Sequence, residues 1–164
     1  KHWSEQLDLD IPVQPVQGQM VLFKTPENWL PTMCMNKVMY LIPRLDGHVV
    51  CGSSMANCGF DTTPTAATKQ TILEACFEMV PELAAFPIVK QWAGLRPSSP
   101  TGVPYIGKMP ELDNVWANFG HFRNGLCMGP ASARLLRQLI LKQPTFLDPT
   151  AFCPTRLTTN TLTT

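Results

Sequence analysis

The segment at 120–127, with the sequence Gly-His-Phe-Arg-Asn-Gly-Leu-Cys, constrains this chain more than any other feature. It follows a short apolar run at 115–119 and precedes an amphipathic pattern at 130–141, which together predict a strand, a glycine-bounded loop and a helix. A helix start presents unpaired N–H groups and a partial positive charge of about half a unit. Arg123 adds a full charge inside the loop. The segment is therefore suited to hold an anion or a heteroaromatic ring that gains electrons.

Composition sets modest bounds on the class of protein. A chain of 164 residues fits one domain or one large piece of a domain, and 45% hydrophobic residues suffice for a substantial core. The net charge is +1 without a long basic or acidic block, which argues against binding to nucleic acid or to a membrane surface. No apolar run approaches the roughly 20 residues that span a bilayer. The first residues lack the apolar core of a signal peptide, so we expect a cytoplasmic protein.

The cysteines and histidines do not form a recognisable chemical motif. None of the six cysteines belongs to a C-x-x-C pair, and we expect reduced thiols that pack as small apolar side chains. The three histidines lie far apart and show no metal-ligand spacing, so no metal site is expected. No Ser/His/Asp or Cys/His arrangement is evident. We therefore expect no catalytic residue that acts as an acid or a base.

The remaining pattern predicts several strands, one helix, more strands and a final helix. Asp46-Gly47 is a turn signal between two apolar runs and predicts a hairpin. Gly18 lies inside the first expected strand and indicates a bulge or a close backbone approach. Thr65 is a candidate N-cap for a helix that ends near Pro81. The strands are expected at 16–23, 38–43, 48–53, 88–95, 105–107 and 115–119. This order favours an α+β fold with an antiparallel sheet.

Two arginines and two strand or loop residues draw attention as ligand contacts. Arg96 ends an apolar strand and Arg123 lies in the glycine-bounded loop, where a permanently charged planar fork suits a carboxylate. If the two guanidinium groups converge, they would select a small anionic molecule. The alternative is that each arginine pairs with an internal Asp or Glu. Tyr40 and Met55 are weaker candidates, because Tyr40 also fits a half-buried strand residue and Met55 alone is uninformative.

Several motifs in a fixed order resemble the FAD-dependent D-amino acid oxidase family. They are Trp-Ala-Gly-Leu-Arg-Pro at 92–97, Gly-Val-Pro-Tyr-Ile-Gly at 102–107 and the loop at 120–126. Tyr-Leu-Ile-Pro-Arg at 40–44 and Gly-Phe-Asp at 59–61 add to the likeness. The closest likeness is to the glycine oxidase branch, which serves thiamine synthesis. The resemblance covers roughly residues 3–157.

The resemblance implies an α+β fold with two parts. A substrate domain with a mixed or antiparallel sheet and helices would cover mainly residues 1–112. Residues 113–157 would form the C-terminal strand, loop and helix of a Rossmann-like FAD-binding domain, and residues 158–164 a disordered tail. The family's N-terminal G-x-G-x-x-G unit does not occur in this sequence. The chain is therefore expected to be the C-terminal part of a longer flavoprotein and to be inactive without the missing FAD-binding part.

The resemblance also assigns roles to individual residues. Arg96 and Arg123 would bind the substrate carboxylate, Tyr40 would line the pocket, and Met55 would limit the space at the α-carbon. Gln17 stands where the family frequently has a basic residue. The flavin's pyrimidine end would be wrapped, largely by backbone groups, by His121, Phe122, Arg123, Asn124, Gly125, Leu126 and Cys127. The helix after the loop would stabilise negative charge on the reduced flavin.

The activity implied by the resemblance is the oxidative deamination of glycine or small D-amino acids. Hydride passes from the substrate α-carbon to the flavin, and oxygen is then reduced to hydrogen peroxide. Two alternatives stay open at this point: a stand-alone binding or assembly module without catalysis, and a D-amino acid dehydrogenase that passes electrons to a quinone. The glycine oxidase likeness further suggests a homo-oligomer.

Overall fold

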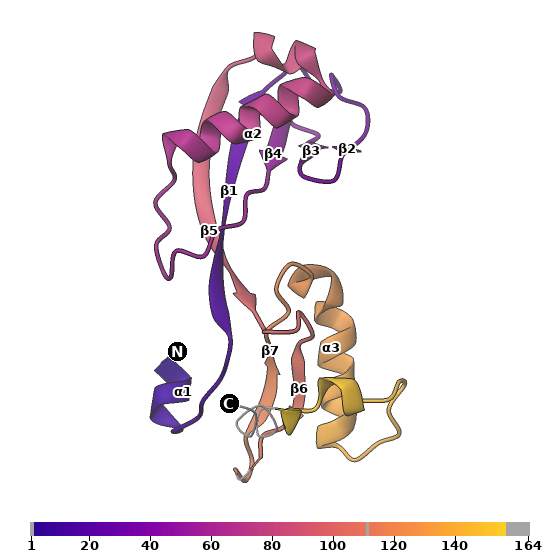
Figure 1. Ribbon diagram of the computed structural model, residues 1–164. Helices are drawn as coiled ribbons and strands as arrows, with labels where there is room; N and C mark the ends of the chain where they lie inside the picture. The colour runs from indigo at the N-terminus through magenta and orange to yellow at the C-terminus, as the bar shows by residue number, and fades with distance from the viewer. Residues whose placement is uncertain (1, 111, 157–164) are drawn as a thin grey trace. The chain divides into compact units, whose positions relative to one another are not determined.

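The computed structural model describes residues 2–110 and 112–156 and divides the chain into two compact units. Residues 15–96 form one unit, here called the sheet unit. Residues 1–14 and 97–164 form the other, here called the helix unit. In chain order, the elements are α1 (His2–Gln6), β1 (Gln14–Lys24), β2 (Cys34–Met35), β3 (Tyr40–Pro43), β4 (His48–Gly52), α2 (Ala66–Met79), the 3-10 helix η1 (Pro81–Ala85), β5 (Ile88–Ser98), β6 (Tyr105–Lys108), β7 (Trp116–Phe119), α3 (Gly125–Ile140) and the 3-10 helix η2 (Thr150–Phe152) (Figure 1).

The sheet unit contains a five-stranded sheet in the order β2-β3-β4-β1-β5. Strands β2 and β3, β3 and β4, and β4 and β1 pair antiparallel. The predicted hairpin joins β3 to β4, and Gly47 adopts a left-handed φ of 75° in its turn. Glycine suits this position because it has no Cβ to clash with the backbone. The hairpin fixes the register that later places Tyr40 opposite Gly52.

Helix α2 covers the sheet, and its start was predicted correctly. The Thr65 hydroxyl accepts a hydrogen bond from the Thr68 backbone N–H at 3.2 Å, which satisfies one of the unpaired donors of the first turn. Ile72 and Cys76 are buried on the face toward the sheet. The helix gives way to η1 at Pro81, as the proline indicated.

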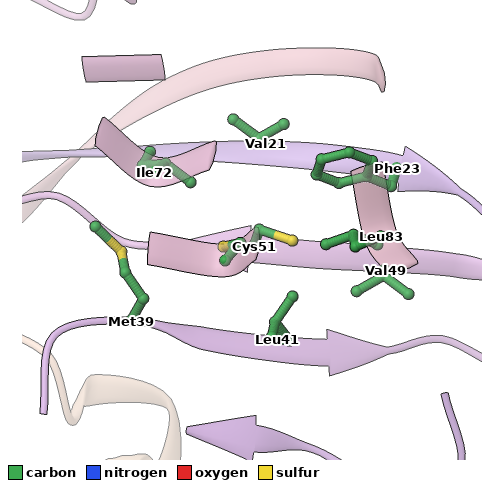
Figure 2. Close-up of a cluster of buried hydrophobic side chains, with 9 residues drawn as sticks. Val21, Phe23, Met39, Leu41, Val49, Cys51, Ile72 and Leu83 are labelled. Carbon is green, nitrogen blue, oxygen red and sulfur yellow. The ribbon is translucent and has the colours of Figure 1, made fainter. Parts of the chain in front are cut away.

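A closed apolar core lies between the sheet and α2. Figure 2 shows strand side chains such as Val21, Phe23 and Leu41 gathered in one cluster with Ile72 of α2 and Leu83 of η1. The fully buried members of this cluster are Val21, Phe23, Met39, Leu41, Val49, Cys51, Ile72, Cys76 and Leu83. Contact with Cys76 and burial raise the pKa of Cys51, so this thiol stays protonated and acts as a packing group. The sheet unit therefore contains its own sealed core.

The helix unit has a smaller sheet and a smaller buried cluster than the sheet unit. Its two strands, β6 and β7, pair antiparallel, with Tyr105 opposite Phe119 and their ring centroids 5.4 Å apart. Helix α3 adds Leu135, which is 1% exposed. The buried cluster consists of Tyr105, Met109 and Ala117, with partly buried apolar neighbours around it.

The largest departures from the sequence-based boundaries concern α3, β5 and the loop at 25–36. Helix α3 begins at Gly125, five residues before the start at 130 that the apolar pattern indicated, and Pro130 therefore lies inside the helix. The pattern missed this first turn because glycine and exposed side chains there carry no amphipathic signal. Strand β5 continues to Ser98, and the loop expected at 25–36 contains the two-residue strand β2.

The mixed helical and antiparallel character of the fold agrees with the predicted α+β class. The compact units divide at 14/15 and 96/97, whereas the functional division was placed at 112/113; the assignment of substrate and flavin binding to these parts stays a prediction. The tail predicted for 158–164 lies outside the described residues. Within the described residues, no helix combines the length and the apolar character needed to cross a membrane.

Candidate functional site

The Arg96 guanidinium is held at one place in the sheet unit by Ser53, Ser54 and Gly18, here called the Arg96 seat. Its Nη2 donates to the Ser53 hydroxyl at 2.7 Å and its Nη1 to the Ser54 carbonyl at 3.2 Å. The guanidinium lies directly over Gly18 of β1, where an added Cβ would stand 2.2 Å from both Nη atoms. The close approach that Gly18 indicated in the sequence is therefore the approach of Arg96. Because a guanidinium is permanently charged, this seat fixes a positive charge at one place in the sheet unit.

Tyr40 lies at the same end of the sheet as the Arg96 seat. Gly52 pairs with Tyr40 on one side and with Met20 on the other. A Cβ on Gly52 would stand 2.4 Å from Met20 Sδ, so the glycine leaves the space that this side chain fills. The Tyr40 hydroxyl donates to Met20 Sδ at 3.6 Å across that space. Ser53, the next residue after Gly52, is the one that accepts from Arg96.

Met55 extends from the loop that follows β4, and 60% of it is exposed. Its neighbours fix the loop to β1: Ala56 and Gln17 exchange two backbone hydrogen bonds of 2.9 and 3.0 Å. The structure thus places Tyr40 opposite Gly52, the Arg96 guanidinium on Ser53 and Ser54, and Met55 next along the same segment. An arginine, a phenol and an apolar residue along one short segment suit a small carboxylate with little side chain.

In the helix unit, the loop at 120–124 owes its shape to its backbone. Gly120 and Phe122 have left-handed φ angles of 78° and 50°. The Phe122 N–H donates to the Pro97 carbonyl at 2.9 Å, and the Asn124 N–H donates to the His121 carbonyl at 3.0 Å. These bonds turn the chain sharply into α3. The predicted order of strand, loop and helix is therefore confirmed, with the helix starting inside the predicted cofactor segment.

The start of α3 carries unused polar groups. The Asn124 side chain makes no capping hydrogen bond, so it leaves the N–H groups of the first turn available. His121 Nε2 is a buried atom that has no hydrogen-bond partner within the described residues. Burial lowers the pKa of His121, which keeps its ring neutral near pH 7. Unpaired donors beside a buried, unpartnered nitrogen suit a bound polar ring, such as the anionic ring of a reduced flavin.

Arg123 stands at this loop as an exposed guanidinium. Within residues 2–110 and 112–156, no side chain or backbone group bonds to it. The alternative of an internal acidic partner for Arg123 therefore finds no support in the described part of the chain. Its neighbour Leu126 is 93% exposed, which is unusual for a large apolar side chain at a helix start.

Sequence reasoning missed the polar residues that support the site. Ser53 and Ser54 hold Arg96, and Gln19 holds Ser54 through two bonds of 2.9 and 3.3 Å. A usable signal exists in β1, where Gln17 and Gln19, two residues apart, share one face of a strand whose interior is otherwise apolar or glycine. Buried polar side chains need partners, so such a pair indicates a hydrogen-bond network.

Two further features lie apart from the candidate residues. A cavity of about 880 Å³ in the helix unit is lined by β6, the start of β7 and the segment 149–156, and none of the candidate site residues lines it. The six cysteines are all free, and only Cys58 and Cys127 are exposed.

The fold and these residues fit a domain of a flavin-dependent oxidoreductase, and comparisons with known proteins show that class and its family. The family described as DAO, FAD dependent oxidoreductase, matches residues 2–139. This chain belongs to that family. FAD is the cofactor of the family.

Individual relatives refine the likeness. The chain is 45% identical over 148 residues to a glycine oxidase of Pseudomonas putida, covering 90% of this chain and 40% of that protein. It is 46% identical over 156 residues to a glycine oxidase of Pseudomonas aeruginosa, covering 93% and 43%. The crystal structure of glycine oxidase from Geobacillus kaustophilus matches with a TM-score of 0.86 and 27% identity, over 93% of this chain and 42% of that one. The chain thus spans about two fifths of the length of these relatives.

Proposed function

We propose that this chain forms the substrate-contacting part, and one portion of the flavin site, of an FAD-dependent amine oxidase that acts on glycine or a small D-amino acid. Membership of the FAD dependent oxidoreductase family and the likeness to proteins named glycine oxidase support this proposal. The position of Arg96 over Gly18 carries it, because a permanently charged guanidinium is fixed there on Ser53 and Ser54 and suits a small carboxylate. These two serines lie between Gly52, which pairs with Tyr40, and Met55.

The loop and helix start of the helix unit are assigned to the flavin. The residues that would contact it are His121, Phe122, Arg123, Asn124, Gly125, Leu126 and Cys127. The free N–H groups at the start of α3 would stabilise negative charge on the ring, and the neutral His121 would present an uncharged nitrogen to it. When bound, FAD supplies a two-electron acceptor for the substrate α-carbon, and in an oxidase molecular oxygen is the final acceptor.

The substrate is assigned to the arginines and the small pocket residues. Arg96 would bind the carboxylate, and Arg123 would contribute a second guanidinium. Tyr40 would line the pocket, and Met55 would restrict the substrate to a small group at the α-carbon. No residue is assigned as an acid or a base, because the protein's task is to orient the neutral amine and to stabilise charge.

The test uses the full-length product of the gene that contains this chain. The proposal predicts a yellow protein with bound FAD that consumes oxygen and releases hydrogen peroxide with glycine. A full-length product without flavin and without turnover of any amino acid would overturn the proposal and favour a stand-alone binding module. Turnover that reduces a quinone but does not consume oxygen would instead identify a dehydrogenase. We further propose that the 164-residue chain alone binds FAD weakly and is inactive, which calorimetry with FAD tests directly.

A further inference from the structure

Three glutamine side chains in the sheet unit form a continuous hydrogen-bonded chain. Gln17 and Gln19 of β1 are 3% and 2% exposed, and Gln91 lies on β5. Gln91 Nε2 donates to Gln19 Oε1 at 3.1 Å, and Gln19 Nε2 donates to Gln17 Oε1 at 2.9 Å. Gln17 Nε2 then donates to the Asp61 carbonyl at 2.8 Å. The chain runs from β5, through β1, to the loop after β4.

Backbone groups at the two ends fix the direction of every amide. The carbonyl of Asp61 can only accept, so Gln17 must point its NH₂ group there and its oxygen toward Gln19. Gln19 must in turn donate to Gln17, and its oxygen faces the Thr65 N–H, a pure donor, at 2.9 Å. Reversing any one amide would oppose two donors or two acceptors. The glutamines therefore form a directional network, which a carboxylate of the same shape cannot replace.

This network holds the far end of the loop that carries the candidate substrate contacts, because its amides bond Asp61 and Thr65. The near end is bonded to the backbone of β1: the Gln19 N–H and C=O bond Ser54, and the Gln17 N–H and C=O bond Ala56. Met55 lies between these two anchored residues. Ser54 also accepts from Arg96. The positions of Met55 and Arg96 thus depend on how β1 holds residues 54–56 and 61–65.

We propose that Gln17, Gln19 and Gln91 form a positioning network that sets substrate affinity by fixing the far end of the loop that carries Met55 and the Ser54 carbonyl, which accepts from Arg96. The inference rests on the proposed function, since it needs a carboxylate substrate at Arg96. The glutamines act through other residues, so they affect the KM for glycine and leave kcat nearly unchanged.

The most informative variant is Gln19→Glu, which preserves shape and removes the donor. Its ionised carboxylate faces the oxygen of Gln17, and a buried unpaired charge of this kind is costly. Burial raises the pKa of such a carboxyl, and its protonated form regains an O–H that can donate to Gln17. The ratio of the KM of Gln19→Glu to the KM of the natural protein should therefore be about ten at high pH. The ratio should fall toward one as the pH falls.

Adding Gln17→Lys to Gln19→Glu should restore the hydrogen-bonded chain, with the bond between positions 17 and 19 now donated by position 17. The ammonium introduced by Gln17→Lys is a pure donor, so in the single variant it opposes the Gln19 NH₂ group. When Gln17→Lys is combined with Gln19→Glu, the introduced ammonium donates to the introduced carboxylate and to the Asp61 carbonyl. That carboxylate still accepts from Thr65 and Gln91. Each single variant should raise the KM about tenfold, and the double variant should recover most of that loss.

The experiment measures KM and kcat for glycine across pH in the full-length gene product, at a temperature where circular dichroism shows every variant folded. Gln70→Glu is the matched control, because Gln70 lies exposed on α2 and also donates one side-chain bond, to Glu74 at 2.9 Å. If Gln19→Glu does not fold, Gln91→Leu removes only the outer donor and should raise the KM about threefold.

The outcomes separate this inference from the proposed function. Natural protein that binds no flavin and oxidises no amino acid overturns the proposed function, and the assigned role of the glutamines with it. Active natural protein with an unchanged KM in Gln19→Glu or Gln91→Leu overturns the network alone. A pH-independent KM ratio, or a double variant no better than the single ones, also overturns it.

Discussion

The sheet unit and the helix unit place their candidate functional residues by different means. In the sheet unit, a nine-residue core lies between the sheet and α2, and the Arg96 guanidinium is held by Ser53 and Ser54 in the space left by Gly18, so the site depends on how side chains fit one another. In the helix unit, the loop at 120–124 takes its shape from left-handed backbone angles at Gly120 and Phe122 and from short backbone hydrogen bonds. Its buried cluster has three residues. Substitutions should therefore act on side-chain contacts in the sheet unit and on backbone conformation in the helix unit.

The largest effect is expected in the core of the sheet unit. Leu41→Ala removes a side chain that is 0% exposed and leaves a cavity beneath α2. Its free energy of unfolding should fall by about 2–5 kcal/mol. Leu45→Ala in the adjacent turn, where the leucine is 93% exposed, is the matched control and should change stability by less than about 0.5 kcal/mol. Urea unfolding measures both, and similar losses in the two variants would contradict a sealed core.

A smaller effect should follow when the space beneath Arg96 is filled. The new Cβ in Gly18→Ala would stand 2.2 Å from the guanidinium nitrogens, so Arg96 must leave Ser53 and Ser54. The expected cost in unfolding free energy is about 1–3 kcal/mol, mainly from lost charge-assisted hydrogen bonds. Gly94→Ala on β5 meets no atom within 4 Å and should be neutral or slightly stabilising. Equal urea midpoints for the two variants would show that stability does not depend on the Arg96 guanidinium lying over Gly18.

In the helix unit, the same exchange should act through the backbone. Gly120→Ala meets only ordinary contacts, at 3.4 Å from Ser99 Cβ and 3.5 Å from Tyr105 and Val13, but its φ is 78°. The expected cost is therefore conformational strain of about 1–2 kcal/mol. Gly129→Ala, inside α3 with open space around it, should instead stabilise the chain by up to about 1 kcal/mol. Thermal unfolding that ranks these two variants in the reverse order would disprove the backbone explanation.

The smallest effect concerns protonation of His121. Burial lowers its folded-state pKa below the ordinary 6.5, so the unfolded chain takes up the proton first as the pH falls. The contribution of His121 to stability is therefore fully present above pH 6.5 and is lost as the pH falls through the lowered folded pKa. Unfolding free energy in the acid range should decline less steeply in His121→Gln than in the natural chain. Parallel pH profiles would show that the environment of His121 does not favour its neutral form.

Much of the fold could be predicted because its signals are local. The turn at Asp46-Gly47, the N-cap at Thr65 and the break at Pro81 each follow from the stereochemistry of a few neighbouring residues. Gly18 was expected to mark a bulge or a close backbone approach, and the group that lies against it is the side chain of Arg96, which the sequence did not indicate. Local signals failed at α3, whose first turn has exposed residues and no apolar stripe.

The support of the candidate site could not be predicted for a different reason. Gln19 and Gln91 are 72 residues apart, and Gln17 reaches Asp61 across 44 residues. Such contacts arise only after the sheet has formed, so no window of sequence contains both partners. Arg96 and Arg123 were singled out from their charge and their places at a strand end and in a glycine-bounded loop, whereas the specific roles of the candidate residues came from the motif resemblance and stay predictions.

The central claim is that Arg96 and Arg123 bind the carboxylate of an amino acid that the flavoprotein oxidises. The direct measurement is the KM for glycine, from peroxide release, in the full-length gene product and in its Arg96→Ala, Arg123→Ala and Arg134→Ala variants. Arg123 is exposed in this chain, so a bound substrate must bury the Arg123 guanidinium together with that of Arg96. Loss of such a charge-assisted contact costs about 2–5 kcal/mol, so the first two variants should raise the KM at least about 30-fold. Arg134, which stacks on Phe146 away from the loop at 120–124, serves as the control and should leave it unchanged. A KM that is unchanged in Arg96→Ala and Arg123→Ala would contradict the account.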